Sequence, residues 1–139
     1  MVIEKVVKKI VTSGKRKTSV ARAVLTEGSG KIIINKKSYT TLHEFDKLKI
    51  EEPLKIAEQI LGKLNFDIVV AVRGGGEKSQ IEASRLALAR AIIEFSKNKD
   101  LEKAFLDYDR NLLVADIRRK EAYKPGDSKA RSKRQSSKR

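Results

Sequence analysis

The sequence predicts an α/β (α+β) domain, in which helices pack on a β-sheet, followed by an extended basic tail. Three observations support this prediction. Short segments rich in Val and Ile are bounded by Gly, as β-strands commonly are. Later segments repeat apolar residues at the spacing of one helix face. The last residues, 117–139, are rich in Lys, Arg and Ser and contain few apolar side chains.

The N-terminal part of the chain predicts three strands. Residues 2–12 mix Val and Ile with Lys and form the first strand, and a basic loop over 12–17 follows it. Residues 19–26 are rich in small and β-branched residues, and we expect them to form the second strand. A Gly-Ser-Gly turn at 28–30 then returns the chain, so Ile32–Ile34 is expected to pair with the second strand as a hairpin.

The middle of the chain predicts two short helices. Thr41 and Glu44 have the spacing of a capping box, which starts a helix that runs through Leu48. Pro53 suits the first turn of a second helix, and Gly62 suits its end.

Residues 66–73 form the most apolar predicted strand. Their apolar run is nearly continuous, which predicts a central strand covered on both faces. Three glycines at 74–76 end the strand. Ser79 and Glu82 then have capping-box spacing at the start of the longest helix. The expected buried stripe of that helix consists of Ile81, Leu88, Ile92 and Phe95.

A helix over 100–108 and a short edge strand over 112–115 complete the predicted body, residues 1–116. The remaining residues, 117–139, cannot bury enough apolar surface to offset the entropy of ordering them. We therefore expect a globular body and an extended basic tail that becomes ordered only against a partner.

The formal net charge of +14 is confined to the two ends of the chain. Residues 117–139 hold ten Lys or Arg and two acids, and residues 1–22 hold seven bases and one acid. The residues between them are electrically balanced. Such segregation favours a polyphosphate partner. Aromatic residues are only 5% of the chain, too few for a base-stacking platform, so recognition of structured RNA by its shape and phosphates is expected.

The glycine-rich loop leaves two other interpretations open. A Walker A loop aligned on Lys78 and Ser79 would have Glu77 in place of its second Gly and Val72 in place of its first. A P-loop-like nucleotide-binding protein with a basic arm is therefore one alternative, and a non-specific DNA-compacting protein is another. If the partner is RNA, the helix start together with Arg73 and Lys78 could hold a backbone phosphate.

No residue pattern supports catalysis. His43 is the only His and the chain has no Cys, so neither a zinc set nor a disulfide is expected. We expect no enzymatic activity and no cofactor. The longest apolar run, 68–72, is too short to cross a membrane, and no signal-peptide pattern is present, so a soluble cytoplasmic protein is expected.

Three motifs resemble the small-subunit ribosomal protein S9 family, and they occur in the family's order over most of the chain. They are Gly14-Lys15-Arg16-Lys17-Thr18-Ser19-Val20-Ala21-Arg22-Ala23, then Gly74-Gly75-Gly76 with Ser79-Gln80 and Ala83-Ser84-Arg85-Leu86-Ala87-Leu88-Ala89-Arg90-Ala91, and the ending Ala130-Arg131-Ser132-Lys133-Arg134-Gln135-Ser136-Ser137-Lys138-Arg139. Ser79 before Gln80 is similar to the archaeal and eukaryotic branch, and a composition rich in Lys, Glu and Ile favours an archaeal-type member.

The resemblance implies a two-layer, mixed, four-stranded sheet with helices packed on it, as in domain 2 of ribosomal protein S5. It also implies a structural protein of the small ribosomal subunit that binds ribosomal RNA of the subunit head beside neighbouring head proteins, with a tail that reaches the peptidyl-site tRNA. The candidate rRNA-binding residues are Lys15, Arg16, Lys17, Arg22, Arg73, Lys78, Arg118, Arg119, Lys120, Lys129, Arg131, Lys133 and Arg134. The implied tRNA-proximal residues are Lys138 and Arg139.

Overall fold

A computed structural model describes residues 9–126 and 130–131, and it confirms the predicted α/β class. Five strands form one mixed sheet in the order β1-β2-β5-β3-β4. They are β1 (Ile10–Arg16), β2 (Ser19–Glu27), β3 (Ile32–Ile34), β4 (Lys37–Ser38) and β5 (Phe66–Arg73). β3 and β5 are parallel and the other pairs are antiparallel. The two-residue β4 is the strand that the expected four-stranded sheet lacked.

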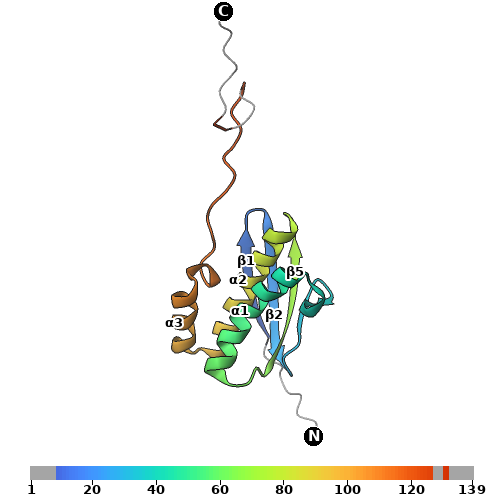
Figure 1. The fold of residues 1–139 in the computed structure, drawn as a ribbon, viewed down its shortest axis with the longest axis vertical. Coiled ribbons are helices and arrows are strands. Elements are labelled where there is room, and N and C mark those ends of the chain that lie inside the picture. Colours follow the sequence, from blue (N-terminus) through green and yellow to red (C-terminus); the bar gives the residue numbers. More distant parts are fainter. Residues whose placement is uncertain (1–8, 127–129, 132–139) are drawn as a thin grey trace, which may run out of the picture.

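The helices cover one face of this sheet. They are α1 (Glu44–Leu61), α2 (Glu77–Ser96) and α3 (Lys99–Tyr108), with 3-10 turns η1 (Tyr39–Thr41) and η2 (Arg110–Leu112). α1 and α2 lie across the sheet, and α3 packs beside α1 (Figure 1). The core lies between the two layers, where alternate residues of β2 and β5, including Leu25, Ile68 and Val70, are buried. The fold is therefore two-layered, and no helix formed by residues 9–126 lies on the second face of the sheet.

The basic loop expected over 12–17 is instead part of β1. Every residue of β1 pairs with β2, from Ile10 opposite Leu25 to Arg16 opposite Ser19. The turn consists of only two residues, and Lys17 adopts a left-handed φ of 54°. The loop prediction was wrong because alternation lets a strand present Lys15 to solvent while Gly14 and Arg16 face the helices.

β3 pairs with β5 and not with β2, so the predicted hairpin was also wrong. β5 lies between them, because it is the most apolar strand and takes the central position. The Asp67 carboxylate fixes this arrangement by accepting backbone hydrogen bonds from Ser29, Gly30 and Lys31 at 3.1, 3.1 and 2.9 Å. These bonds, with the one from Lys31 the strongest, lower the pKa of Asp67 below its usual value.

α1 is one helix where two were expected. It begins after His43, and Pro53 lies buried inside it. Ile50, Leu54 and Ala57 continue the buried stripe past the proline. Their packing offsets the loss of about 3 kcal/mol that an interior proline causes. The predicted end at Gly62 is confirmed by its φ of 82° and by its N–H bond to the Glu58 carbonyl.

α2 begins at Glu77 with Gly76 as its N-cap, so the predicted cap at Ser79 was wrong. The predicted stripe is confirmed for Ile81, Leu88 and Ile92, which are buried. Phe95 is partly buried and meets Phe66 edge to face at 5.6 Å between ring centroids. The periodicity thus located this helix correctly, whereas the capping-box pattern placed its start too late in the chain.

Two other predictions were wrong at the sheet. β5 is not covered on both faces: Ile68, Val70 and Val72 are buried, whereas Val69 is 49% exposed. The edge strand expected over 112–115 does not form, because the chain closes the η2 turn and buries Leu112 against the core instead. The basic residues of the candidate site lie on the uncovered face of the sheet around β5 and along the chain that follows Leu112.

Candidate nucleic-acid interface

The open face of the sheet gathers three of the predicted cations. Lys15 on β1 and Arg73 on β5 both pair with Val20 of β2, from opposite sides, so the three side chains lie on one face. Arg22 follows two residues after Val20 and pairs with Ala71 on the same face. We call Lys15, Arg22 and Arg73 the sheet-face cations.

The sheet-face cations are exposed, and two of them, Arg22 and Arg73, line a hollow of about 290 Å³ together with Val20 and Ala71. Within the described residues, none of the three cations has an ion pair with an acid. Val20, which is 44% exposed, and Ala71 lie between them. Such a surface suits a phosphate backbone, which needs unpaired cations and a close, flat approach.

A second group forms where the β1–β2 turn meets the start of the tail. Lys17 lies in the turn, and Arg118, Arg119 and Lys120 follow the body directly. A hollow of about 590 Å³ is lined by Arg16, Lys17, Thr18, Arg118, Arg119 and Lys120. Residues separated by roughly a hundred positions in the sequence thus form one basic surface.

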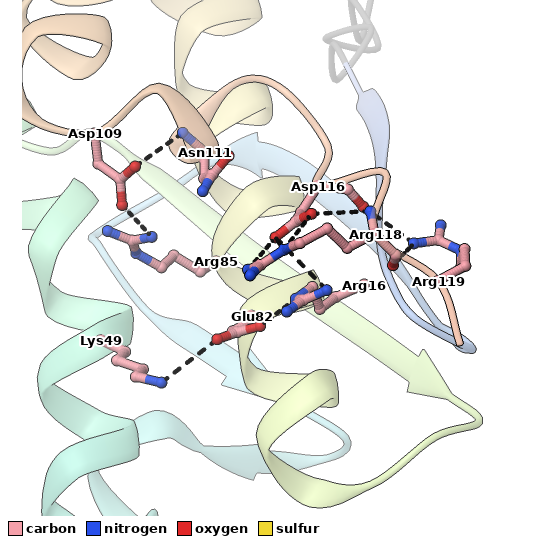
Figure 2. A network of polar contacts seen from close by, with 9 residues as sticks. All are labelled: Arg16, Lys49, Glu82, Arg85, Asp109, Asn111, Asp116, Arg118 and Arg119. Carbon is pink, nitrogen blue, oxygen red and sulfur yellow. Dashed lines mark hydrogen bonds and ion pairs between the residues drawn. The ribbon is translucent and has the colours of Figure 1, made fainter. Parts of the chain in front are cut away.

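Two members of this group are held by acids. The Arg16 side chain is only 14% exposed, and its Nε donates to Glu82 Oε2 at 2.6 Å (Figure 2). Arg118 donates from Nε and Nη2 to the Asp116 carboxylate, the shorter distance being 2.6 Å. The hydrogen bonds from Arg118 lower the pKa of Asp116 far below its usual range, and Asp116 in turn raises the pKa of Arg118.

The other cations at this site remain at the surface. Arg119 donates from Nη1 to the backbone carbonyls of Asp116 and Arg118. The Lys120 ammonium lies 4.4 Å from the centre of the Tyr123 ring. Arg131 is 87% exposed and donates to Glu121. Lys129, Lys133, Arg134, Lys138 and Arg139 lie outside the described residues.

The glycine-rich loop is folded onto the hairpin. Gly74 and Gly75 have left-handed φ values of 79° and 64°, and the Gly74 carbonyl accepts a bond from the buried Ser19 hydroxyl at 2.9 Å. A Cβ at Gly75 would lie 2.1 Å from that same hydroxyl oxygen. The glycines therefore permit close packing of two loops. Lys78 lies in the first turn of α2, apart from the strands that carry the sheet-face cations.

Sequence reasoning missed two polar residues that organise this region. Arg90 stands out in the sequence only as one residue of the central motif, yet it donates to the carbonyls of Leu113 and Ser13 at 3.0 and 2.9 Å. No sequence pattern marks Asp116 as functional, apart from its position two residues before Arg118. Both act through contacts between distant segments, which a local pattern does not encode.

Arg85 is a third such residue. Its side chain, 13% exposed, contacts Glu52 of α1. It also contacts Asp109, which follows α3 (Figure 2). Arg85 thus connects α2 with α1 and with the end of α3, on the helical side of the sheet and away from the sheet-face cations.

The comparison with known families decides the class of the chain. The model of a family described as "Ribosomal protein S9/S16" matches residues 14–139. The chain belongs to this family. The family's motif with Gly14 forms the β1–β2 hairpin, and its central signature forms the loop and helix from Gly74 to α2. As a ribosomal protein, the chain is a cytoplasmic ribosome component and a structural protein, not an enzyme.

Curated archaeal proteins are similar to the chain over nearly its whole length. The small ribosomal subunit protein uS9 of Methanococcus vannielii is 49% identical over 133 residues, which cover 94% of this chain and 98% of that protein. The protein of the same name from Methanococcus maripaludis is 47% identical over the same shares. That of Thermoplasma volcanium is 46% identical over 92% of this chain and 96% of its own length. The archaeal type expected from the sequence is confirmed.

Across residues 9–126 and 130–131, no helix combines the length and apolar character that a membrane span needs.

Proposed function

We propose that this S9/S16 family member binds ribosomal RNA in the head of the small ribosomal subunit through the sheet-face cations and the base of its tail. The body, residues 1–116, docks on folded RNA, and the tail, residues 117–139, continues from the body along the RNA. The observation that carries the proposal is that, in the described part of the chain, Lys15, Arg22 and Arg73 have no ion pair with an acid and lie on a face that no helix covers. Cations without acidic partners can replace the counterions of a phosphate backbone.

The tail supplies the second part of the proposal. Its bases are spread along the segment between Ser, Gly and Ala, which permit close approach to a backbone. Arg131, Lys133 and Arg134, with Lys129, would follow a path through RNA, and Lys138 and Arg139 would lie beside the peptidyl-site tRNA. An arginine can bind a phosphate through two parallel hydrogen bonds, so a terminal Arg139 suits this position.

The experiment compares the full chain with residues 1–116 alone in salt titrations of binding to the 3′-domain ribosomal RNA. Every phosphate that the shortened chain no longer neutralises should reduce the log–log salt slope by roughly 0.7 to 0.9. Circular dichroism confirms that the shortened chain is folded. A control chain keeps all residues but has Gln in place of the ten Lys and Arg of 117–139, which separates the charge of the tail from its length.

An unchanged slope in both variants would contradict phosphate binding by the tail. Small subunits assembled with either variant should also hold peptidyl-site tRNA more weakly than those with the full chain. Weaker RNA binding together with unaltered tRNA affinity would remove the tRNA from the proposal and leave the RNA in it.

Neither alternative function from the sequence is supported by the site. The loop that the nucleotide-binding alternative would use packs Gly74 and Gly75 against Thr18 and Ser19, and its Gly74 carbonyl is occupied by two side-chain donors. A DNA-compacting protein would bind duplex DNA as tightly as folded ribosomal RNA at equal salt, and the same titrations include that comparison.

A further inference from the structure

The chain leaves its body at a cluster of five charged side chains, which are Asp116, Arg118, Arg16, Glu82 and Lys49. Asp116 is the last residue before the tail, and its side chain is 14% exposed. Its carboxylate accepts from the backbone N–H of Arg118 at 3.0 Å and from the Arg118 guanidinium. On its other side, Arg16 Nη1 lies 3.6 Å from Asp116 Oδ2. This distance is too long for a hydrogen bond but short enough for strong attraction between opposite charges.

The cluster connects the tail to rigid elements. Arg16 belongs to β1, and its Nε is held by Glu82 of α2. Lys49 of α1 reaches the other oxygen of Glu82 at 3.7 Å. Figure 2 shows these side chains in a continuous series from α1 through α2 and β1 to Asp116. The position of Asp116 is thus defined by three elements of the core layers.

The segment before the cluster is fixed as well, whereas the segment after it is not. Leu112 is buried, and Arg90 binds the Leu113 carbonyl. Beyond Asp116, the described hydrogen bonds and ion pairs of residues 117–125 join them to each other, to Asp116 or to Arg131. Ile117 is 87% exposed. Figure 1 shows this part of the chain leading away from the body.

We infer that Asp116 is a positioning residue, which fixes the direction in which the basic tail leaves the body through its contacts with Arg16 and Arg118. An acidic side chain in a basic surface weakens the attraction of that surface for phosphate. Asp116 therefore favours RNA binding by fixing the direction of the tail, and not by attracting phosphate itself. A tail whose first residues already point along one direction loses less entropy when it binds. The effect on RNA binding rests on the proposed function, whereas the effect on tail direction does not.

The first measurement is made on the free, full-length protein. Because the chain has no Cys, nitroxide labels can be attached at Ile117→Cys and Glu94→Cys, both on exposed residues. Glu82 belongs to the cluster around Asp116, next to the label at position 117, and Glu94 lies twelve residues further along α2, about 18 Å along the helix axis. This separation suits distance measurement by pulsed electron paramagnetic resonance. Asp116→Asn is compared with Asp107→Asn, which removes the same charge from the exposed surface of α3.

We expect a narrow distance distribution in the labelled parent and in the Asp107→Asn variant. The distribution should be at least roughly twice as wide in the Asp116→Asn variant, because the ion pairs with Arg16 and Arg118 that hold the first residues of the tail are then lost. Equal widths in the two variants would overturn the inference. Thermal unfolding of each variant shows whether the body remains folded, so that a general loss of structure is distinguished from a freed tail.

The second measurement uses binding to the 3′-domain ribosomal RNA. The two Asn variants have equal net charge, but Asp116→Asn removes an acid from the basic surface, so charge alone predicts that it binds at least as tightly as Asp107→Asn. The inference predicts that Asp116→Asn binds the RNA roughly fivefold more weakly than Asp107→Asn, because a tail without a fixed starting direction loses more conformational entropy when it binds. Equal or tighter binding with a widened distribution would reject the role of tail direction in RNA binding. Failure of the parent chain to bind the RNA would reject the proposed function and leave the distance result to decide the inference.

Discussion

Gly14→Ala is expected to destabilise the protein by about 3 kcal/mol or more, the upper end of the cost of overpacking a core. A Cβ at this position would lie 2.3 Å from the Ala83 carbonyl oxygen and 2.7 Å from the Ala87 nitrogen, both in the backbone of α2. Helix backbone cannot move aside as a flexible side chain can. The added methyl would therefore push α2 away from β1 and break the Thr12 hydroxyl bond to the Ala87 carbonyl, now 2.8 Å.

Urea unfolding of the two proteins measures this effect. Gly76→Ala is the matched control, because nothing lies within 4 Å of a Cβ there and its φ of −94° suits any residue. The control should cost less than about 1 kcal/mol, the range for an N-cap change. Equal stability of Gly14→Ala and the parent would mean that α2 does not lie directly on β1.

The second large effect is expected for RNA binding. Replacing Lys15, Arg22 and Arg73 together by Gln should reduce the log–log salt slope by roughly 2 to 3 and the affinity for 3′-domain ribosomal RNA at 0.1 M salt by roughly a hundredfold. The reason is the loss of three unpaired cations from one exposed face. Because all three side chains are exposed, the free energy of unfolding should change little.

The control for the triple variant is Lys63→Gln, Lys99→Gln and Lys103→Gln. These three exposed residues lie after α1 and on α3, and their replacement changes the net charge by the same amount. Its salt slope should equal that of the parent. If the two triple variants bind alike, the sheet face is not the RNA surface and only the overall charge matters.

Much of the fold follows from local patterns in the sequence. The apolar run of β5, the alternation of β2 and the periodicity of α2 each identify an element, because burial imposes a spacing on side chains. What local patterns do not show is which neighbour an element meets. The pattern of β5 predicts a strand with two buried faces, yet no helix covers the side that bears Val69. Pro53 predicts a helix start, yet the buried stripe continues past it.

The same limit applies to the candidate site. The sequence identifies the basic residues, and the structure separates them by their partners. Arg16 and Arg118 are held by acids, whereas Lys15, Arg22 and Arg73 are unpaired among the described residues. Gly14 is predicted to lie in a loop, yet it is where α2 approaches β1 most closely. The contacts of Arg16 with Glu82 and Asp116 join residues 66 and 100 positions apart in the chain, so no local pattern reveals them.

RNA–protein cross-linking in intact small subunits, with the linked peptides identified by mass spectrometry, would locate the RNA surface on the protein. If the uncovered sheet face and the base of the tail contact ribosomal RNA, linked residues should come from Lys15, Arg22, Arg73 and residues 117–131. Cross-links confined to α1 and α3, with none on β1, β2 or β5, would show that RNA lies on the helical side and would contradict binding through the sheet face.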